Sequence, residues 1–161
     1  GLKSNYNYFT SYEAKTYKAF FSEEYLKKLN KPTKKTKFVM EFVFQDMSRT
    51  VFKKTILKGS IRGAFCLIIS VRDKIEVENL INFQKNIKNI NQVYSEIWES
   101  KEIKDFKISK EESLRGKDKK FSSCLYLEFT NGNDAVFLMD DAKSIFSEAE
   151  IGAYQLISTL T

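Results

Sequence analysis

Ten lysine and arginine residues within the first sixty positions have the clearest potential to bind a partner. Residues 1–60 carry a net charge of +8, residues 121–161 carry −5, and the whole chain carries +6. A cluster of cations of this size attracts anionic surfaces and polymers. The candidate residues of this basic cluster are Lys27, Lys28, Lys31, Lys34, Lys35, Lys37, Arg49, Lys53, Lys54 and Lys58.

Three interpretations of the basic cluster are open. The first is a solvated surface that favours solubility and needs no partner. The second is an anionic membrane surface, where each lysine or arginine adds about 1 kcal/mol of attraction. The third is nucleic acid, bound through its phosphates in a salt-dependent way. We favour nucleic acid less, because the aromatic residues near the lysines alternate toward a predicted core instead of lying free to stack on bases.

Residue types that support catalysis or metal binding are scarce. The chain has no histidine, which removes the commonest general base and the commonest metal ligand. The adjacent acids Glu23–Glu24, Glu111–Glu112 and Asp140–Asp141 are expected to point apart, whereas a catalytic pair must converge on one bond. Cys66 and Cys124 lie in apolar runs, which favours two buried thiols over a disulfide. We expect no catalytic residue, no metal site and no cofactor, and a protein that is not an enzyme.

A helix and a loop are predicted to carry the first lysines of the basic cluster. Thr10 and Glu13 form a capping-box pattern that begins this helix, and Ser22 offers a second start. The helix is predicted to end near Leu29. Residues 30–36 contain the single proline of the chain and are predicted to form a basic loop.

Two strands are predicted to carry the rest of the basic cluster. Residues 37–45 alternate in polarity, which predicts a strand with one face on the core. Residues 49–58 have charges on both faces, which is typical of an edge strand. Pairing of the two would place several of the cations at one end of the sheet. The residues expected to face the core are Phe38, Met40, Phe42 and Phe44.

The middle of the chain predicts a central strand and a long helix. Residues 61–71 are apolar on both faces, as in a strand covered from both sides. Residues 74–99 contain an apolar stripe at spacings of three and four, which predicts one helix. Residues 111–120 are polar and are predicted to form a mobile loop. The stripe consists of Leu80, Phe83, Ile87, Ile90, Tyr94 and Ile97.

The end of the chain predicts a hairpin followed by a helix. Residues 121–130 and 135–139 have the composition of strands, and Asn-Gly within 131–134 suits a tight turn. Ser147 precedes a predicted helix over 148–160. The expected fold class is α+β, with a mainly antiparallel sheet of five or six strands. Two long helices, over about 74–99 and 148–160, and the N-terminal helix pack on it.

One domain over residues 10–161 is expected, preceded by an entry segment over residues 1–9. The predicted order of strands, final hairpin and C-terminal helix resembles the end of a pleckstrin-homology domain. That resemblance implies binding of phosphoinositides by basic residues near the first hairpin. The loosely corresponding residues here are Lys34, Lys35, Lys37, Arg49, Lys53 and Lys54.

The composition is similar to that of surface lipoproteins of AT-rich spirochaetes. The chain is rich in Lys, Asn, Ile and Phe, has one proline and lacks histidine, and the similarity includes no shared motif. Such lipoproteins commonly bind host or partner macromolecules and are not enzymes. We therefore expect an exported surface protein whose membrane tether has been trimmed and which binds a macromolecular partner. The alternative is a cytoplasmic module that binds anionic lipid or nucleic acid. The sequence does not identify the partner or the oligomeric state.

Overall fold

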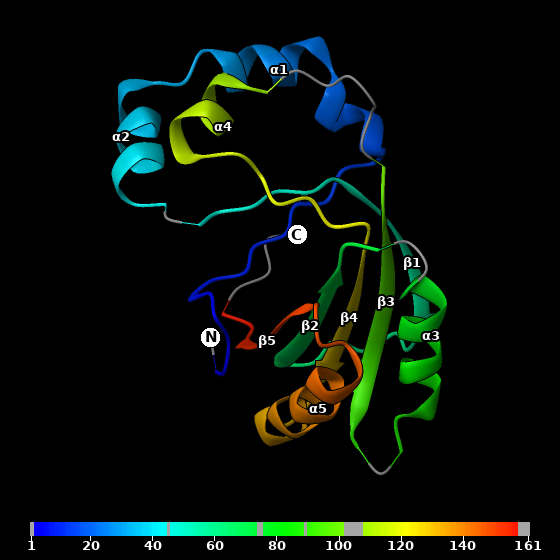
Figure 1. Ribbon diagram of the computed structural model, residues 1–161. Coiled ribbons are helices and arrows are strands. Elements are labelled where there is room, and N and C mark those ends of the chain that lie inside the picture. The colour runs from blue at the N-terminus through cyan, green and yellow to red at the C-terminus, as the bar shows by residue number, and fades with distance from the viewer. Residues whose placement is uncertain (1, 45, 74–75, 89, 102–107, 158–161) are drawn as a thin grey trace. The chain divides into compact units, whose positions relative to one another are not determined.

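A computed structural model of the chain describes residues 2–44, 46–73, 76–88, 90–101 and 108–157 (Figure 1). The chain divides into two compact units. We call residues 1–11, 54–99 and 121–161 the sheet unit, and residues 12–53 and 100–120 the helical unit. The chain crosses between the two units four times, so neither unit is one continuous segment.

A five-stranded sheet dominates the sheet unit. Its strand order is β1-β3-β4-β2-β5, and β2 pairs antiparallel with both β4 and β5 while β3 pairs antiparallel with β4. Beyond β5, Lys3 forms an antiparallel bridge with Ala153. The strands are β1 (Phe52–Lys58), β2 (Phe65–Val71), β3 (Gln92–Ser100), β4 (Ser123–Phe129) and β5 (Glu150–Gln155).

One face of this sheet holds the apolar core. Helices α3 (Glu76–Asn86) and α5 (Gly132–Ile145) contribute buried residues to the same cluster as alternate residues of the strands (Figure 1). Every residue of β4 is buried, so this strand is covered on both faces. The core includes Leu67, Ile69, Leu80, Leu125, Leu127, Phe129, Leu138 and Met139.

Four short helices are the main regular elements in the described part of the helical unit. Helix α4 packs against both α1 and α2. Side chains of Ser22, Thr33 and Ser109 cap α1, α2 and α4 by accepting backbone hydrogen bonds from the first turn. The elements are a 3₁₀ helix η1 (Tyr17–Phe21), α1 (Glu23–Asn30), α2 (Lys34–Phe42) and α4 (Lys110–Arg115). Within the described ranges, no helix combines the length and the apolar character that crossing a bilayer requires.

Several predictions are confirmed. The fold class is α+β, and the sheet has five strands. The strand predicted at 49–58 is β1 and lies at an edge, whereas the strand predicted at 61–71 is β2 and lies inside the sheet. Cys66 and Cys124 are buried free thiols.

The prediction for residues 37–45 is wrong, because residues 34–42 form helix α2. The Thr33 side chain accepts a hydrogen bond from the backbone N–H of Thr36 at 3.1 Å and starts the helix. The aromatic residues that alternate along a strand are also four apart, and Phe38 and Phe42 meet on one helical face. Alternation of side-chain types over so short a segment fits the two-residue period of a strand and also the 3.6-residue period of a helix.

The single helix predicted over 74–99 is also wrong. Helix α3 ends at Asn86, and residues 92–100 form β3. The apolar stripe nevertheless contributes to the core, where Leu80 and Ile97 are buried. The exception is Tyr94, which lies beside Glu128 and donates to Glu96. The later part of the stripe is rich in aromatic and β-branched residues, which favour a strand when a neighbouring strand is present.

The strand predicted at 121–130 is confirmed as β4, but a helix follows it where the second hairpin strand was predicted, and a strand stands in place of the final helix. Asn131 caps helix α5 by accepting the backbone N–H of Asn133 at 2.9 Å, so residues 135–139 are helical. Residues 150–155 form β5, which pairs with β2, where a helix over 148–160 was predicted. The order that resembles a pleckstrin-homology domain is therefore not the order of this chain.

Three smaller predictions were tested at the edges of the helical unit. Residues 10–16 are not helical, so Thr10 does not cap the first helix, whereas Ser22 does cap α1. The predicted loop 111–120 contains most of α4. The sequence around Ile103 and Phe106 also suggests a short strand or a position on the sheet edge, but both residues lie outside the described ranges.

Candidate anionic-surface interface

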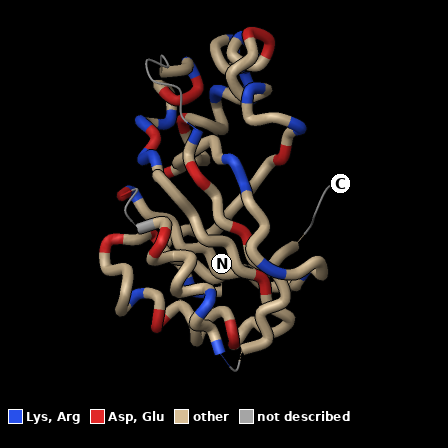
Figure 2. The backbone as a smooth tube through the Cα atoms, turned by 90° about the vertical axis from the view of Figure 1, so that its right-hand side faces the viewer, with Lys and Arg blue, Asp and Glu red and all other residues tan. Residues whose placement is uncertain are grey.

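Positive charge is concentrated in the helical unit. This unit has 18 basic and 10 acidic residues and a net charge of +8, whereas the sheet unit has 9 basic and 11 acidic residues and a net charge of −2. Figure 2 shows the positions of these residues along the backbone. Eight of the ten predicted cluster residues belong to the helical unit, namely Lys27, Lys28, Lys31, Lys34, Lys35, Lys37, Arg49 and Lys53.

The remaining two predicted residues belong to the sheet unit and have other surroundings. Lys54 forms an ion pair with the buried carboxylate of Glu96, with 3.3 Å between Nζ and Oε1. Lys58 is exposed at the end of β1. The predicted convergence depended on pairing of two strands, one of which is a helix, so the structure does not unite all ten residues.

The lysines of α1 and α2 are exposed. Lys27 and Lys28 lie in the last turn of α1, and Lys28 forms an exposed ion pair with Glu24 at 3.2 Å. Lys34 and Lys35 begin α2, whose first turn contains no acidic residue. The partial positive charge of the helix N-terminus adds to these cations, an arrangement that is unfavourable for an isolated helix and favourable for an anionic partner.

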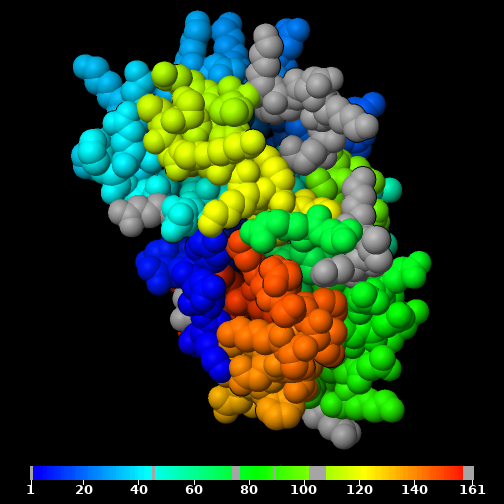
Figure 3. Space-filling view, in the orientation of Figure 1, coloured from blue at the N-terminus to red at the C-terminus, as the bar shows by residue number. Residues whose placement is uncertain are grey.

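Apolar side chains accompany the lysines on α2. Phe38 is 58% exposed, Phe42 is 67% exposed and Val43, just after the helix, is 58% exposed. The rings of Phe38 and Phe42 contact each other with 5.3 Å between centroids. We call Lys34, Lys35, Phe38, Phe42 and Val43 the α2 patch; the residues of α2 are cyan in Figure 3.

The opposite side of α2 faces its own unit. Thr36, Val39 and Met40 are half-buried, and α2 packs against α4. With about 100° of rotation per residue, Thr36 and Met40 lie on the side of the helix opposite Phe38 and Phe42, and Val39 lies between the two sides. Within the α2 patch, Lys34, Lys35, Phe38 and Phe42 thus form the outward face of the helix. Val43 is exposed just after the helix end and is not part of that face.

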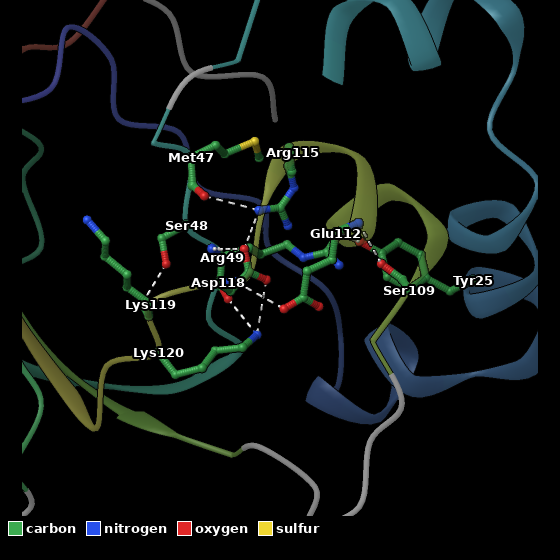
Figure 4. Close-up of polar contacts among 10 residues, drawn as sticks. All are labelled: Tyr25, Met47, Ser48, Arg49, Ser109, Glu112, Arg115, Asp118, Lys119 and Lys120. Carbon is green, nitrogen blue, oxygen red and sulfur yellow. Dashed lines mark hydrogen bonds and ion pairs between the residues drawn. The ribbon is translucent and has the colours of Figure 1, made fainter. Parts of the chain in front are cut away.

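A buried carboxylate, Asp118, organises the segments that support α2 (Figure 4). Asp118 Oδ1 accepts hydrogen bonds from Arg115 Nη1 and, at 3.2 Å, from the backbone N–H of Arg49. Lys120 Nζ donates to Oδ2 at 3.3 Å. The side chains of Asp118 and Arg115 are 0% and 1% exposed, so this is a buried ion pair. Burial alone would raise the pKa of Asp118, but Arg115 and Lys120 outweigh it and hold the pKa below its ordinary value.

The same network links the segment that follows α2 with helix α4. Arg115 Nη1 also donates to the backbone oxygen of Met47 at 3.1 Å. Glu112 Oε1 accepts the backbone N–H of Asp118 at 3.1 Å. Arg49, which was predicted as a ligand of an anionic partner, donates to the Tyr25 hydroxyl at 3.3 Å and is half-buried. Arg49 therefore helps to hold the helical unit together and also adds to its positive charge.

A second buried polar cluster lies in the sheet unit and was missed from the sequence. Two Tyr-x-Glu segments occupy neighbouring strands, with Tyr94 beside Glu128 and Glu96 beside Tyr126 in the pairing register. Each tyrosine hydroxyl donates to the glutamate two residues later in its own strand. The repeated spacing was a usable signal, because residues two apart in a strand share a face.

Cations and further donors complete this Tyr-x-Glu cluster. Arg62 donates from Nε to both oxygens of Glu128, at 2.9 and 3.0 Å, and stacks over the Tyr94 ring at 4.6 Å. The Glu128 hydrogen bond raises the pKa of Arg62 further above its ordinary value. Glu96 accepts the Trp98 indole N–H at 2.6 Å. Since both carboxylates are hydrogen-bonded and paired with cations, the arrangement fits a network that holds β3 and β4 together.

Burial also affects the side chains around the Tyr-x-Glu cluster. It raises the pKa of Tyr94 to about 12 and the pKa of Cys66 to about 12. Tyr126 stacks on Trp98 with 5.1 Å between centroids, and burial raises its pKa. Protonated hydroxyl groups at neutral pH act as hydrogen-bond donors, which suits their contacts with the two glutamates.

The chain matches no protein-family model, and neither curated protein sequences nor solved structures are significantly similar to it.

Proposed function

We propose that this protein is a non-enzymatic binding module whose helical unit binds an anionic macromolecular surface. The observation that carries the proposal is the separation of charge, with +8 on the helical unit and −2 on the sheet unit. A field of one sign on one unit raises the local concentration of an oppositely charged partner and speeds its association. Export and tethering to a membrane rest on composition and remain part of the proposal.

The position of the lysines supports this function. Lys34, Lys35 and Lys37 are exposed at the start of α2, and Lys31 precedes them. The Asp118 network fixes the segment that follows α2. The lysines therefore lie on a helix whose position in the unit is held by hydrogen bonds. A preorganised surface loses less conformational entropy on binding than a flexible chain does.

The proposal is tested by removing three charges from α2. The variant K34Q/K35Q/K37Q is compared with the native chain for binding to phosphatidylcholine vesicles containing phosphatidylserine, and to single-stranded and duplex DNA. The salt concentration is varied from about 50 to about 300 mM. The matched control removes three exposed lysines of the sheet unit, Lys85, Lys88 and Lys143.

The native chain is expected to bind at least one anionic probe, with an affinity that falls as salt rises. If each lysine near the surface adds about 1 kcal/mol, the α2 variant loses roughly a hundredfold in affinity. The control has the same net charge and is expected to lose much less. Absence of binding to every probe at low salt, or an equal loss in both variants, would contradict the proposal.

A further inference from the structure

We infer that the partner of the helical unit is an anionic lipid bilayer, and that Phe38 and Phe42 of helix α2 insert into it. This inference rests on the proposed function and specifies the partner. It depends on the α2 patch, where two largely exposed phenylalanines lie beside exposed lysines on one helix and an exposed valine follows the helix end. Large exposed apolar side chains that are rimmed by charge mark a docking surface.

The order of side chains around α2 is that of an interfacial helix. With about 100° of rotation per residue, Lys34, Phe38, Phe42 and Lys35 follow one another within about 100° of the helix surface. The two phenylalanines therefore lie between two lysines. Aromatic side chains between lysines suit the boundary between headgroups and acyl chains, where the rings are buried and the ammonium groups stay among the phosphates.

The charges that surround the patch match an anionic bilayer. Lys31 and Lys37 are exposed close to the patch and add to its positive charge. The acid on the same helix, Glu41, is one turn from Lys37 and lies beside Lys34, at the edge of the patch, where it offsets one of these cations. A bilayer that contains phosphatidylserine thus meets mainly cations around the two rings.

Val43 favours a bilayer over single-stranded nucleic acid. Exposed phenylalanines could stack on bases, since every base has an aromatic face. Val43 offers no ring to stack on, yet it is as exposed as Phe38, at 58%. Phe44 follows it and is 42% exposed. Side chains that share only an apolar character are better matched by acyl chains than by bases.

The experiment replaces the rings and leaves the charges. F38A/F42A is assayed by sedimentation with phosphatidylcholine vesicles that contain phosphatidylserine, with phosphatidylcholine vesicles alone, and with single-stranded DNA. The matched control is F137A/I145A on α5, whose two side chains are 65% and 60% exposed in the sheet unit. Circular dichroism compares the helix content of both variants with that of the native chain. A third variant, F42W, reports insertion through quenching of its fluorescence by lipids with brominated acyl chains.

The native chain and F137A/I145A are expected to bind the anionic vesicles equally. F38A/F42A should bind them at least about tenfold more weakly with unchanged helix content, because its apolar contribution is lost. F42W should be quenched more than the native chain, whose single tryptophan, Trp98, lies in the sheet unit.

Four results would overturn the inference. If F38A/F42A binds the vesicles like the native chain, the rings do not insert. If F42W is quenched no more than the native chain, the ring at this position stays outside the acyl chains. If DNA is bound and vesicles are not, the partner is nucleic acid, and the proposed function stands while the inference fails. If neither is bound, both fail.

Discussion

The Asp118→Ala variant tests the internal frame of the helical unit. Asp118 is the counter-ion of Arg115, and both side chains are essentially inaccessible to solvent. Its removal leaves a buried guanidinium whose Nε and Nη2 already have no hydrogen-bond partner among the described residues. We therefore expect the helical unit, rather than the sheet unit, to lose stability.

The expected loss can be worked out from the contacts. Removing one partner of a buried ion pair costs about 3–5 kcal/mol, because the other charge stays buried. The lower end applies here, because Lys120 is 40% exposed and its share of the interaction is screened by water. A loss of about 3 kcal/mol corresponds to a rise of roughly a hundredfold in the population of the opened unit.

Native-state hydrogen exchange followed by mass spectrometry separates the two units. Peptides from α4 and from residues 46–49 should exchange roughly a hundredfold faster in Asp118→Ala, whereas peptides from β2 and β4 should be unchanged. The matched control is Glu24→Ala, which removes the exposed ion pair with Lys28. Exposed pairs contribute only about 0–1 kcal/mol, so little change is expected there. Equal exchange in Asp118→Ala and the native chain would refute the role given to this carboxylate.

The pH dependence of this protection has a definite sign. Arg115 and Lys120 lower the pKa of folded Asp118, whereas the unfolded chain has an ordinary value of about 3.9. The stabilisation is therefore present at neutral pH and is lost as the pH falls below about 4 through the folded pKa. In Asp118→Ala the helical unit should lose less protection over this acid range than it does in the native chain.

Two further predictions concern the sheet unit. Burial raises the pKa of Cys66 and of Cys124 to about 12, so both thiols should react slowly with Ellman's reagent at pH 8 in the native protein and rapidly in urea; two fast equivalents without urea would contradict this. Gly59 has a φ of +83°, and a Cβ there would lie 1.9 Å from the backbone oxygen of Val93. Gly59→Ala should therefore lower the free energy of unfolding by at least about 1–2 kcal/mol in urea titrations, whereas its exposed neighbour Ser60→Ala should change it by less than about 0.5 kcal/mol; equal midpoints would refute this.

The sequence was most informative where the order of apolar and polar residues fits only one kind of element. Residues 65–71 are apolar on both faces, and such a run fits a covered strand better than any amphipathic element. Residues 123–129 carry Leu125, Leu127 and Phe129 on one face and Glu128 on the other, an alternation that also fits a strand. It was least informative where two local signals coexist. Asn131–Gly132 suits a hairpin turn, but the asparagine also caps a helix, and packing of α5 on the sheet decides between them.

The candidate site divides in the same way. Lysine positions follow from the sequence, because charged side chains are nearly always exposed. The exposure of Phe38 and Phe42 could not be predicted, since it depends on which side of α2 meets α4. The Asp118 network could not be predicted either, because its contact with Arg49 joins residues that are 69 positions apart in the sequence. Pairings of that separation leave no local pattern.

The division of the helical unit into two chain segments has a consequence for synthesis in the cell. Residues 12–53 emerge from the ribosome first, but Asp118 and α4 belong to the second segment. At a synthesis rate of about 5–20 residues per second, several seconds pass between the synthesis of α1 and α2 and that of the residues that pack against them. During this interval the two phenylalanines of α2 are part of an incomplete unit. A chaperone or a membrane near the exit of the ribosome would meet them before the folded protein exists.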